Sequence, residues 1–277
     1  PNFNYTDNTL FTSLKSSSSD FLTDSGYKTS EIGFSLGTRF EQFQNIYLSP
    51  EIDFLIEDLE TSDKASSTLK KQEGSYTDLY FNYTINQDLR DKRYRSESGY
   101  QTFFSQEVPL VSDNSEFSNA FEISKYKKLS TKSDTIGKIS FYAKTITGLS
   151  DDVRVSKRLN VPSYKLRGFE KGKVGPVENS DYIGGNHVSA LNLSATLPNI
   201  VEGLDNLDIG VFFDAANVWG VDYDSSLPNS NKVRSSTGVA ASWISPVGPM
   251  TFILSTNLSK APTDETESFN FSLGTTF

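Results

Sequence analysis

The feature that most constrains the fold of this chain is a two-residue alternation of apolar and polar side chains. In the clearest segment, Ile32, Phe34, Leu36 and Phe40 are apolar, and small or polar residues lie between them. Successive side chains of a β-strand point to opposite faces, so each such segment predicts a strand with one apolar face. The pattern returns at 52–56, 79–85, 117–123, 139–143, 191–197, 209–215, 252–254 and 269–277.

Weaker segments at 10–18, 101–110 and 234–245 bring the prediction to about twelve strands, of the length expected for tilted membrane strands. Mean hydropathy is only -0.42, yet 13% of the residues are aromatic. A barrel that has lipid outside and water inside needs this balance, with an apolar residue at every second position. A soluble β-sandwich also alternates. The even succession of strands, the aromatic content and the lack of edge-protecting devices favour an all-β fold, a transmembrane antiparallel β-barrel.

Composition excludes several classes of function. The net charge of -9 and the pI near 4.8 argue against nucleic acid as a partner. With no cysteine and a single histidine, His187, the chain offers no thiolate or histidine-rich metal site, and no cofactor is expected. No nucleophile elbow accompanies His187, so we expect no enzyme activity. The acidic run Glu57-Asp58-Leu59-Glu60 lacks the alternating ligands of a calcium loop and is interpreted as a solvated strand end.

Two connections differ from ordinary turns. Residues 61–74 are polar and charged, which predicts a solvated surface loop. Residues 151–186 show no clear alternation and are too long for a casual connection. They also carry Tyr164, Leu166 and Phe169 together with several cations. This content favours a loop that folds back onto the rest of the protein.

Motifs in and after this loop carry a resemblance to a known family. The loop contains Leu166-Arg167-Gly168-Phe169 and, later, Ile183-Gly184-Gly185-Asn186. Residues 212–219 read Phe-Phe-Asp-Ala-Ala-Asn-Val-Trp, residues 245–249 read Ser-Pro-Val-Gly-Pro, and the chain ends on an alternating strand at Phe277. In this order the motifs resemble the BamA superfamily of outer-membrane barrels, the bacterial surface antigens. The resemblance is specific over 150–277, whereas 1–149 fits as upstream barrel strands.

The resemblance implies that residues 1–277 form an outer-membrane β-barrel domain whose loop 151–186 folds into the lumen. Family barrels have about 16 strands, in keeping with the even numbers of bacterial barrels. Five predicted strands follow the loop and about seven precede it. We therefore expect the chain to be truncated at its N-terminus, with the first strands and the periplasmic POTRA domains lying outside it.

The family's loop motif is Val-Arg-Gly-Phe, and Leu166 is a mild apolar replacement of its valine. The resemblance implies that Arg167 meets an acidic residue of the barrel wall. The alternation places Phe213 toward lipid and Asp214 toward the lumen, so Asp214 is the expected partner. A guanidinium group matches a carboxylate with two parallel hydrogen bonds. A solvated loop arginine is the alternative interpretation.

Other loop residues are expected to shape the backbone. Gly168 allows a tight turn of the loop tip against the wall, and Phe169 is expected to pack beside it. Gly184, Gly185 and Asn186 are expected to return the loop to the next strand.

The last strand has Phe269, Phe271, Leu273 and Phe277 on one face. In the family such a strand is both the assembly signal and one side of a seam, whereas an ordinary lipid-facing strand would look the same.

The resemblance implies a factor in the outer membrane of a Gram-negative bacterium that folds and inserts other outer-membrane proteins. Its partners would be the lipid bilayer, nascent outer-membrane proteins and assembly-complex lipoproteins. The alternatives are a protein translocator of the same superfamily, TamA-like or a two-partner secretion pore, and a passive porin-like barrel.

Overall fold

The structure is a computed structural model that describes residues 7–130, 132, 134–198, 206–224, 227, 231–245 and 248–273. Its main element is one antiparallel sheet of 12 strands, which confirms the prediction of an all-β fold with about twelve strands. The strands of this sheet are β1 (Thr9–Phe21), β2 (Tyr27–Phe43), β3 (Ile46–Thr61), β4 (Gly74–Asp88), β5 (Ser98–Ser112), β6 (Glu116–Lys128), β7 (Ile136–Gly148), β10 (His187–Pro198), β11 (Leu207–Trp219), β12 (Arg234–Ser245), β13 (Gly248–Ser259) and β14 (Phe269–Leu273).

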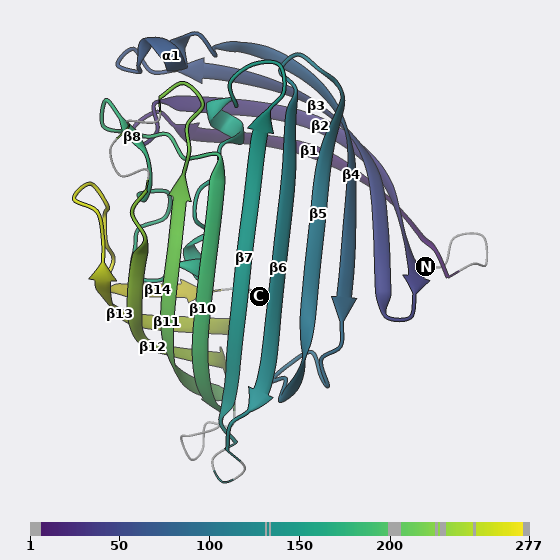
Figure 1. The fold of residues 1–277 in the computed structure, drawn as a ribbon, viewed down its shortest axis with the longest axis vertical. Coiled ribbons are helices and arrows are strands. Elements are labelled where there is room, and N and C mark those ends of the chain that lie inside the picture. Colours follow the sequence, from purple (N-terminus) through teal and green to yellow (C-terminus); the bar gives the residue numbers. More distant parts are fainter. Residues whose placement is uncertain are drawn as a thin grey trace.

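The strands follow one another in the sheet in the order of the sequence, so each pairs with its neighbours along the chain (Figure 1). The exception is the step from β7 to β10, which pair directly although the long loop separates them. That loop contains only two 3₁₀ turns, η2 (Val155–Lys157) and η3 (Ser163–Lys165), and a small hairpin of β8 (Val177–Glu178) and β9 (Asp181–Tyr182). Seven strands of the sheet precede the loop and five follow it, as predicted.

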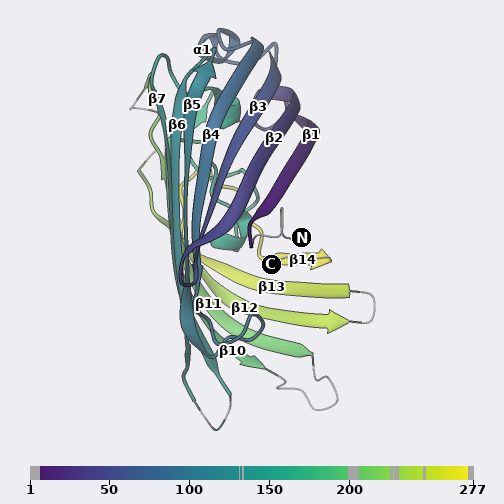
Figure 2. The same ribbon diagram turned by 90° about the vertical axis from the view of Figure 1, so that its right-hand side faces the viewer.

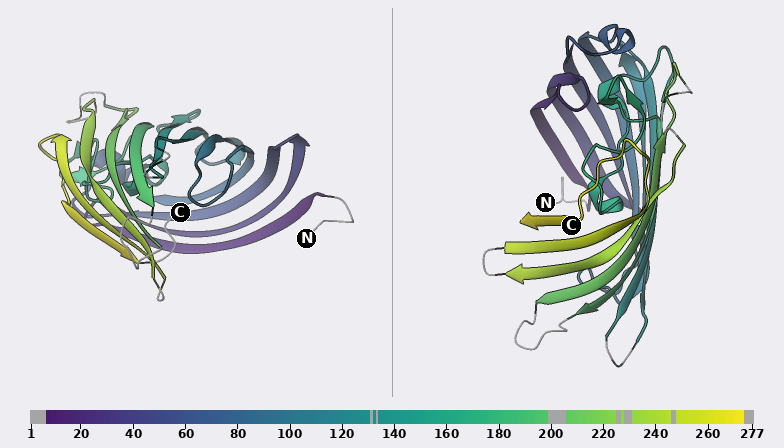
Figure 3. Two further views of the ribbon diagram at one scale, coloured as in Figure 1. Left: turned by 90° about the horizontal axis from the view of Figure 1, so that it is seen from below. Right: turned by 90° about the vertical axis from the view of Figure 1, so that its left-hand side faces the viewer.

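The sheet curls strongly but does not close. Figures 2 and 3 show a curved wall whose first strand, β1, and last strand, β14, lie apart at its two edges. Among the described residues β1 pairs only with β2, and β14 only with β13. The wall therefore has the shape of an open barrel with two free strand edges.

The two faces of this wall differ in chemistry, as the alternation predicts. On the convex face, Ile32, Phe34, Ile52 and Phe54 are all exposed. Exposed apolar side chains continue on this face as far along the chain as Val211 of β11. The concave face carries polar and charged side chains under the long loop. An apolar outside and a polar inside are what a membrane barrel requires. None of the helices in the described ranges is long and apolar enough to cross a membrane.

The structure corrects the interpretation of residues 61–74 as a merely solvated loop. This connection forms a short helix, α1 (Ser67–Lys70), whose N-cap is Ser66, with its hydroxyl accepting from the Leu69 amide at 3.1 Å. Leu69 is fully buried and packs with Ala65 against Val155 and Ile183 of the long loop. Two apolar residues in an otherwise charged segment thus hold it against the protein.

Candidate functional site

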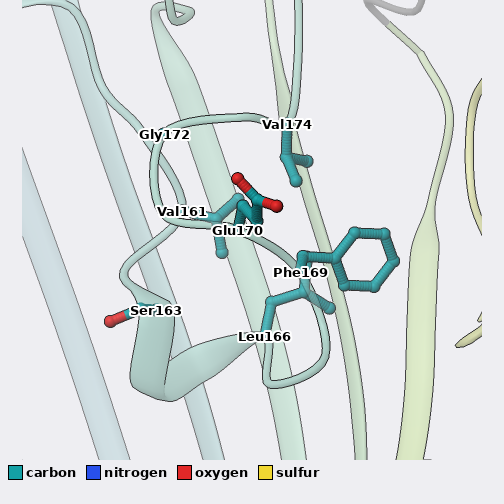
Figure 4. A pocket seen from close by; sticks show the side chains of 7 residues that line it. All are labelled: Val161, Ser163, Leu166, Phe169, Glu170, Gly172 and Val174. Carbon is teal, nitrogen blue, oxygen red and sulfur yellow. The ribbon is translucent and has the colours of Figure 1, made fainter. Parts of the chain in front are cut away.

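The long loop between β7 and β10 lies on the concave side of the sheet (Figures 2 and 3). Its apolar side chains form a core with the wall strands β7, β10 and β11. Leu166 and Phe169 are 2% and 5% exposed. Figure 4 shows Val161, Leu166, Phe169 and Val174 gathered around a small hollow within the loop. Burial of each side chain of this size stabilises the folded state by about 1.5–3 kcal/mol, so apolar contacts alone favour docking of the loop on the wall.

Arg167 lies directly against Asp214 of β11. Its Nε donates to Asp214 Oδ2 at 2.7 Å, its Nη2 donates to Oδ1 at 2.8 Å, and its backbone amide donates to Oδ2 at 3.1 Å. The Asn192 amide also donates to Asp214 Oδ1 at 2.8 Å, which leaves this fully buried carboxylate well satisfied. The guanidinium carbon stands 3.6 Å from the ring centroid of Phe212, a stacking that suits a planar cation.

Gly168 forms the turn of the loop tip beside this pair. Its φ of +91° is in the region that favours glycine. A Cβ atom there would come within 2.9 Å of Ser255 Oγ and 3.1 Å of Ser255 Cβ, so the backbone touches the wall directly. Its carbonyl accepts from Asn257 Nδ2 at 2.8 Å, and the carbonyl of Arg167 accepts from the Ser236 hydroxyl. The tip is thereby fixed to β12 and β13 as well as to β11.

A second arginine, Arg154, anchors the start of the loop, and the sequence analysis did not single it out. Its guanidinium donates to Asp78 at 2.6 Å, to Glu116 at 2.9 Å and to Glu57 at 3.1 Å. All four side chains are essentially inaccessible to solvent, at 0–1% exposure. We name these residues the Arg154 cluster. Burial lowers the pKa of Arg154, but the hydrogen bonds and charges of Glu116 and Asp78 outweigh it and raise the pKa overall.

The Arg154 cluster also corrects the interpretation of the acidic run at 57–60. Glu57 was interpreted as part of a solvated strand end, yet it shares the inward parity of Leu55 and Leu59 and is fully buried. Only its Oε2 accepts from Arg154, and its Oε1 has no hydrogen-bond partner among the described residues. The outward-facing Asp58 and Glu60 are the exposed members of the run.

Two lysines make further contacts between the loop and its surroundings. The Lys165 ammonium group donates to Glu122 of β6, and burial lowers its pKa more than this bond raises it. Lys173 lies 2.6 Å from Asp24, in the β1–β2 turn, and 3.4 Å from Glu265, in the β13–β14 connection. The middle of the loop therefore bridges the hairpins at the two edges of the open sheet.

The end of the loop returns to β10 through Ile183-Gly184-Gly185-Asn186. Gly184 has φ +68°, and Gly185 forms an isolated antiparallel bridge with Leu159 near the start of the loop. The buried Asn186 donates from Nδ2 to Asp222 at 2.5 Å. These residues close the base of the loop just before His187, which lies beside Trp219 with ring centroids 5.6 Å apart.

The last strand presents Phe269, Phe271 and Leu273 on the exposed face, and the ring of Phe271 lies 4.9 Å from that of Phe252. Over the described residues, which end at Leu273, β14 pairs with Met250–Leu254 of β13. Phe277 lies outside the described residues, as do Pro246 and Val247 of the penultimate turn. The described part of the chain holds no group of three or more His, Cys, Asp or Glu that is arranged to bind a metal.

The site is thus a loop held to the concave wall by two buried arginine contacts, an arrangement suited to fixing a loop rather than to bond chemistry. The Omp85 superfamily domain model matches residues 1–277. The outer membrane protein assembly factor BamA of Neisseria meningitidis is 33% identical to this chain, over 40% of this chain and 17% of that protein.

Solved structures show the same fold. BamA from Haemophilus ducreyi, lacking POTRA domains 1–3, superposes with a TM-score of 0.83 at 21% identity, over 97% of this chain and 59% of that one. CdiB from Acinetobacter baumannii gives 0.61 at 12% identity, over 96% and 48%. The chain thus spans less than two thirds of each of these relatives. From the family match over its whole length, the chain belongs to the Omp85 superfamily of outer-membrane β-barrel proteins of Gram-negative bacteria.

Proposed function

We propose that the protein folds and inserts other β-barrel proteins into the outer membrane, with residues 151–186 as the loop that occupies its lumen. Barrels of this superfamily are not enzymes, and the proposed activity is likewise a binding and templating one. The observation that carries the proposal is the bidentate contact of Arg167 with the buried Asp214, which holds the loop against the wall at the position of the family's loop motif. The similarity to a BamA protein favours assembly over other activities of the superfamily.

The mechanism that we propose uses a strand edge as a template. An unpaired edge presents N–H and C=O groups that an incoming strand can satisfy by β-augmentation. β14, with Phe269, Phe271 and Leu273 facing outward, is the edge that we assign to this role, because among the described strands it pairs with β13 alone and corresponds to the family's seam strand. Its counterpart would be a first strand supplied by the upstream part of the parent protein, which would also carry the POTRA domains. Nascent outer-membrane proteins, and lipoproteins of an assembly complex, are the proposed partners.

The test is the folding of a small outer-membrane barrel into liposomes that contain the full-length parent protein. The proposal predicts faster folding than in protein-free liposomes, without a steady ion current in planar bilayers made with the same preparation. No acceleration, together with steady conductance, would leave a translocator of the same superfamily or a passive porin-like pore and would overturn the assembly function.

A further inference from the structure

The convex face of the sheet has a hollow over β6, β7, β10 and β11, which lie side by side in Figure 1. The hollow is a groove of about 590 Å³, within the range of small-molecule sites, which is about 300–1,000 Å³. It lies on the side of the wall opposite to the long loop. Neither the loop contacts nor the strand-edge mechanism uses it.

The strand register explains why the groove exists. One row across the convex face consists of Lys127, Gly137, Ala195 and Val211, each paired with the next on adjacent strands. Gly137 has no side chain, and the side chain of Leu129 lies over it. Ala195 has only a methyl group, so the surface drops at Ala195, between Leu129 and Val211. In the neighbouring row, Ile139, Leu193 and Phe213 form an apolar side of the groove, and Lys125 lies at the β6 end of that row.

The groove is apolar along its length and cationic at one end. Ile139, Leu193 and Val211 are among the exposed large apolar residues of the convex face. Lys125 and Lys127 are both exposed at the β6 end of the groove, and neither forms an ion pair with any described residue. Their neighbour Lys128, in contrast, is paired with Glu97 and Asp134. An apolar channel with two unpaired cations at its end is complementary to a molecule with a long apolar chain and an anionic head.

The position along the strand identifies the region of the bilayer. Lys125 is three residues from the end of β6, which at a rise of about 3.3 Å per residue places both lysines within about 10 Å of that end of the strand. This end is opposite to the long loop, and in outer-membrane barrels the end with the short turns faces the periplasm. Lysines at that depth extend their ammonium groups to the headgroup layer while their stems lie along apolar surface. The outer leaflet is at the other end of the barrel.

We propose that this groove is a binding site for an anionic glycerophospholipid of the periplasmic leaflet, with an acyl chain over Ala195, against Leu129 and Leu193, and the phosphate between Lys125 and Lys127. The bound lipid would cover the depression in the convex face and neutralise the two lysines. The proposal depends on the outer-membrane location of the barrel and is independent of whether it assembles other proteins.

The experiment is native mass spectrometry of the detergent-solubilised protein, titrated with phosphatidylglycerol or phosphatidylcholine of identical acyl chains. The wild type should retain one phosphatidylglycerol in preference to phosphatidylcholine. Lys125→Gln with Lys127→Gln should lower the affinity for phosphatidylglycerol by about 25-fold, because each lysine near an anionic lipid contributes about fivefold. Phosphatidylcholine binding should change little.

Two further variants make the result specific. Lys64→Gln with Lys71→Gln removes the same charge from exposed positions near the other end of the barrel and should leave the preference intact. Ala195→Leu fills the groove without touching a lysine and should weaken the binding of both lipids. Folding of every variant is verified by the mobility shift of unheated protein on gels. Equal losses in both lysine pairs, unchanged binding in the groove-filled variant, or no headgroup preference in the wild type would each overturn the proposal.

Discussion

Replacing Arg167 by alanine should release the tip of the long loop from the wall. The substitution leaves Asp214, which is fully buried, with hydrogen bonds from Asn192 and from the residue 167 amide but without a countercharge. Breaking a buried ion pair by removing one partner costs about 3–5 kcal/mol. The Arg167 side chain is 18% exposed, which favours the lower end of this range. A loss of about 3 kcal/mol raises the population of the opened tip by about 100-fold.

Limited proteolysis with trypsin measures this opening at Lys165, a residue only 3% exposed in the docked loop. When opening and closing are fast relative to cleavage, the cleavage rate follows the open population. The rate at Lys165, read by mass spectrometry, should therefore rise by about 100-fold in Arg167→Ala. Arg93→Ala removes an exposed arginine elsewhere and should change the rate by less than twofold. If cleavage at Lys165 is equally slow in all three proteins, the Arg167 and Asp214 contact does not hold the loop.

Three further outcomes are expected. Arg154→Met should unfold the barrel at lower urea than Arg167→Ala does, because it leaves three buried carboxylates unpaired. Replacing Glu57, Asp78 and Glu116 by their amides in the same variant should restore much of the lost stability. An unchanged urea midpoint in Arg154→Met would contradict this. Gly168→Ala should loosen the loop tip and speed trypsin cleavage at Lys165. Gly172 also has positive φ but has open space around it, so Gly172→Ala should leave Lys165 protected. Equal cleavage rates in the two variants would show that the contact of Gly168 with the wall is unimportant. Burial raises the pKa of Tyr223 to about 12, so the contribution of its neutral form to loop docking is complete below pH 10 and is lost as the pH rises toward 12. Tyr223→Phe should remove this alkaline loss from the pH dependence of the urea midpoint, and a profile identical to that of the wild type would contradict it.

The fold was largely predictable because each strand has lipid on one side and water on the other. This environment requires apolar and polar residues to alternate along the strand, and the alternation is visible in the sequence. Phe213 and Asp214 are adjacent, and their parity alone was enough to point one outward and the other inward. The weaker segments were recognised only as approximate strands. β5, for example, extends over Ser98–Ser112 and has a register shift opposite Leu79 and Tyr80, which interrupts its alternation.

The Arg154 cluster could not be found in this way. The three carboxylates come from β3, β4 and β6, and they meet Arg154 only because the loop crosses the wall at that height. Each carboxylate alone resembles an ordinary polar residue of the lumen. Glu57 is also difficult to distinguish in the sequence, because it stands in one acidic run with the exposed Asp58 and Glu60. The inward parity that Glu57 shares with Leu55 and Leu59 was the one available signal. Sequence spacing also says nothing about Lys173, whose two acidic neighbours belong to opposite edges of the sheet.

The central claim is that the contact of Arg167 with Asp214 holds the loop in the state that assembles other barrels. The most direct measurement is a double-mutant cycle on the rate at which the full-length protein accelerates folding of a small barrel in liposomes. The claim predicts that Arg167→Ala and Asp214→Ala each slow folding, and that the double variant is no slower than the worse single variant, because both remove one interaction. Independent, additive losses, or full activity in either single variant, would contradict it.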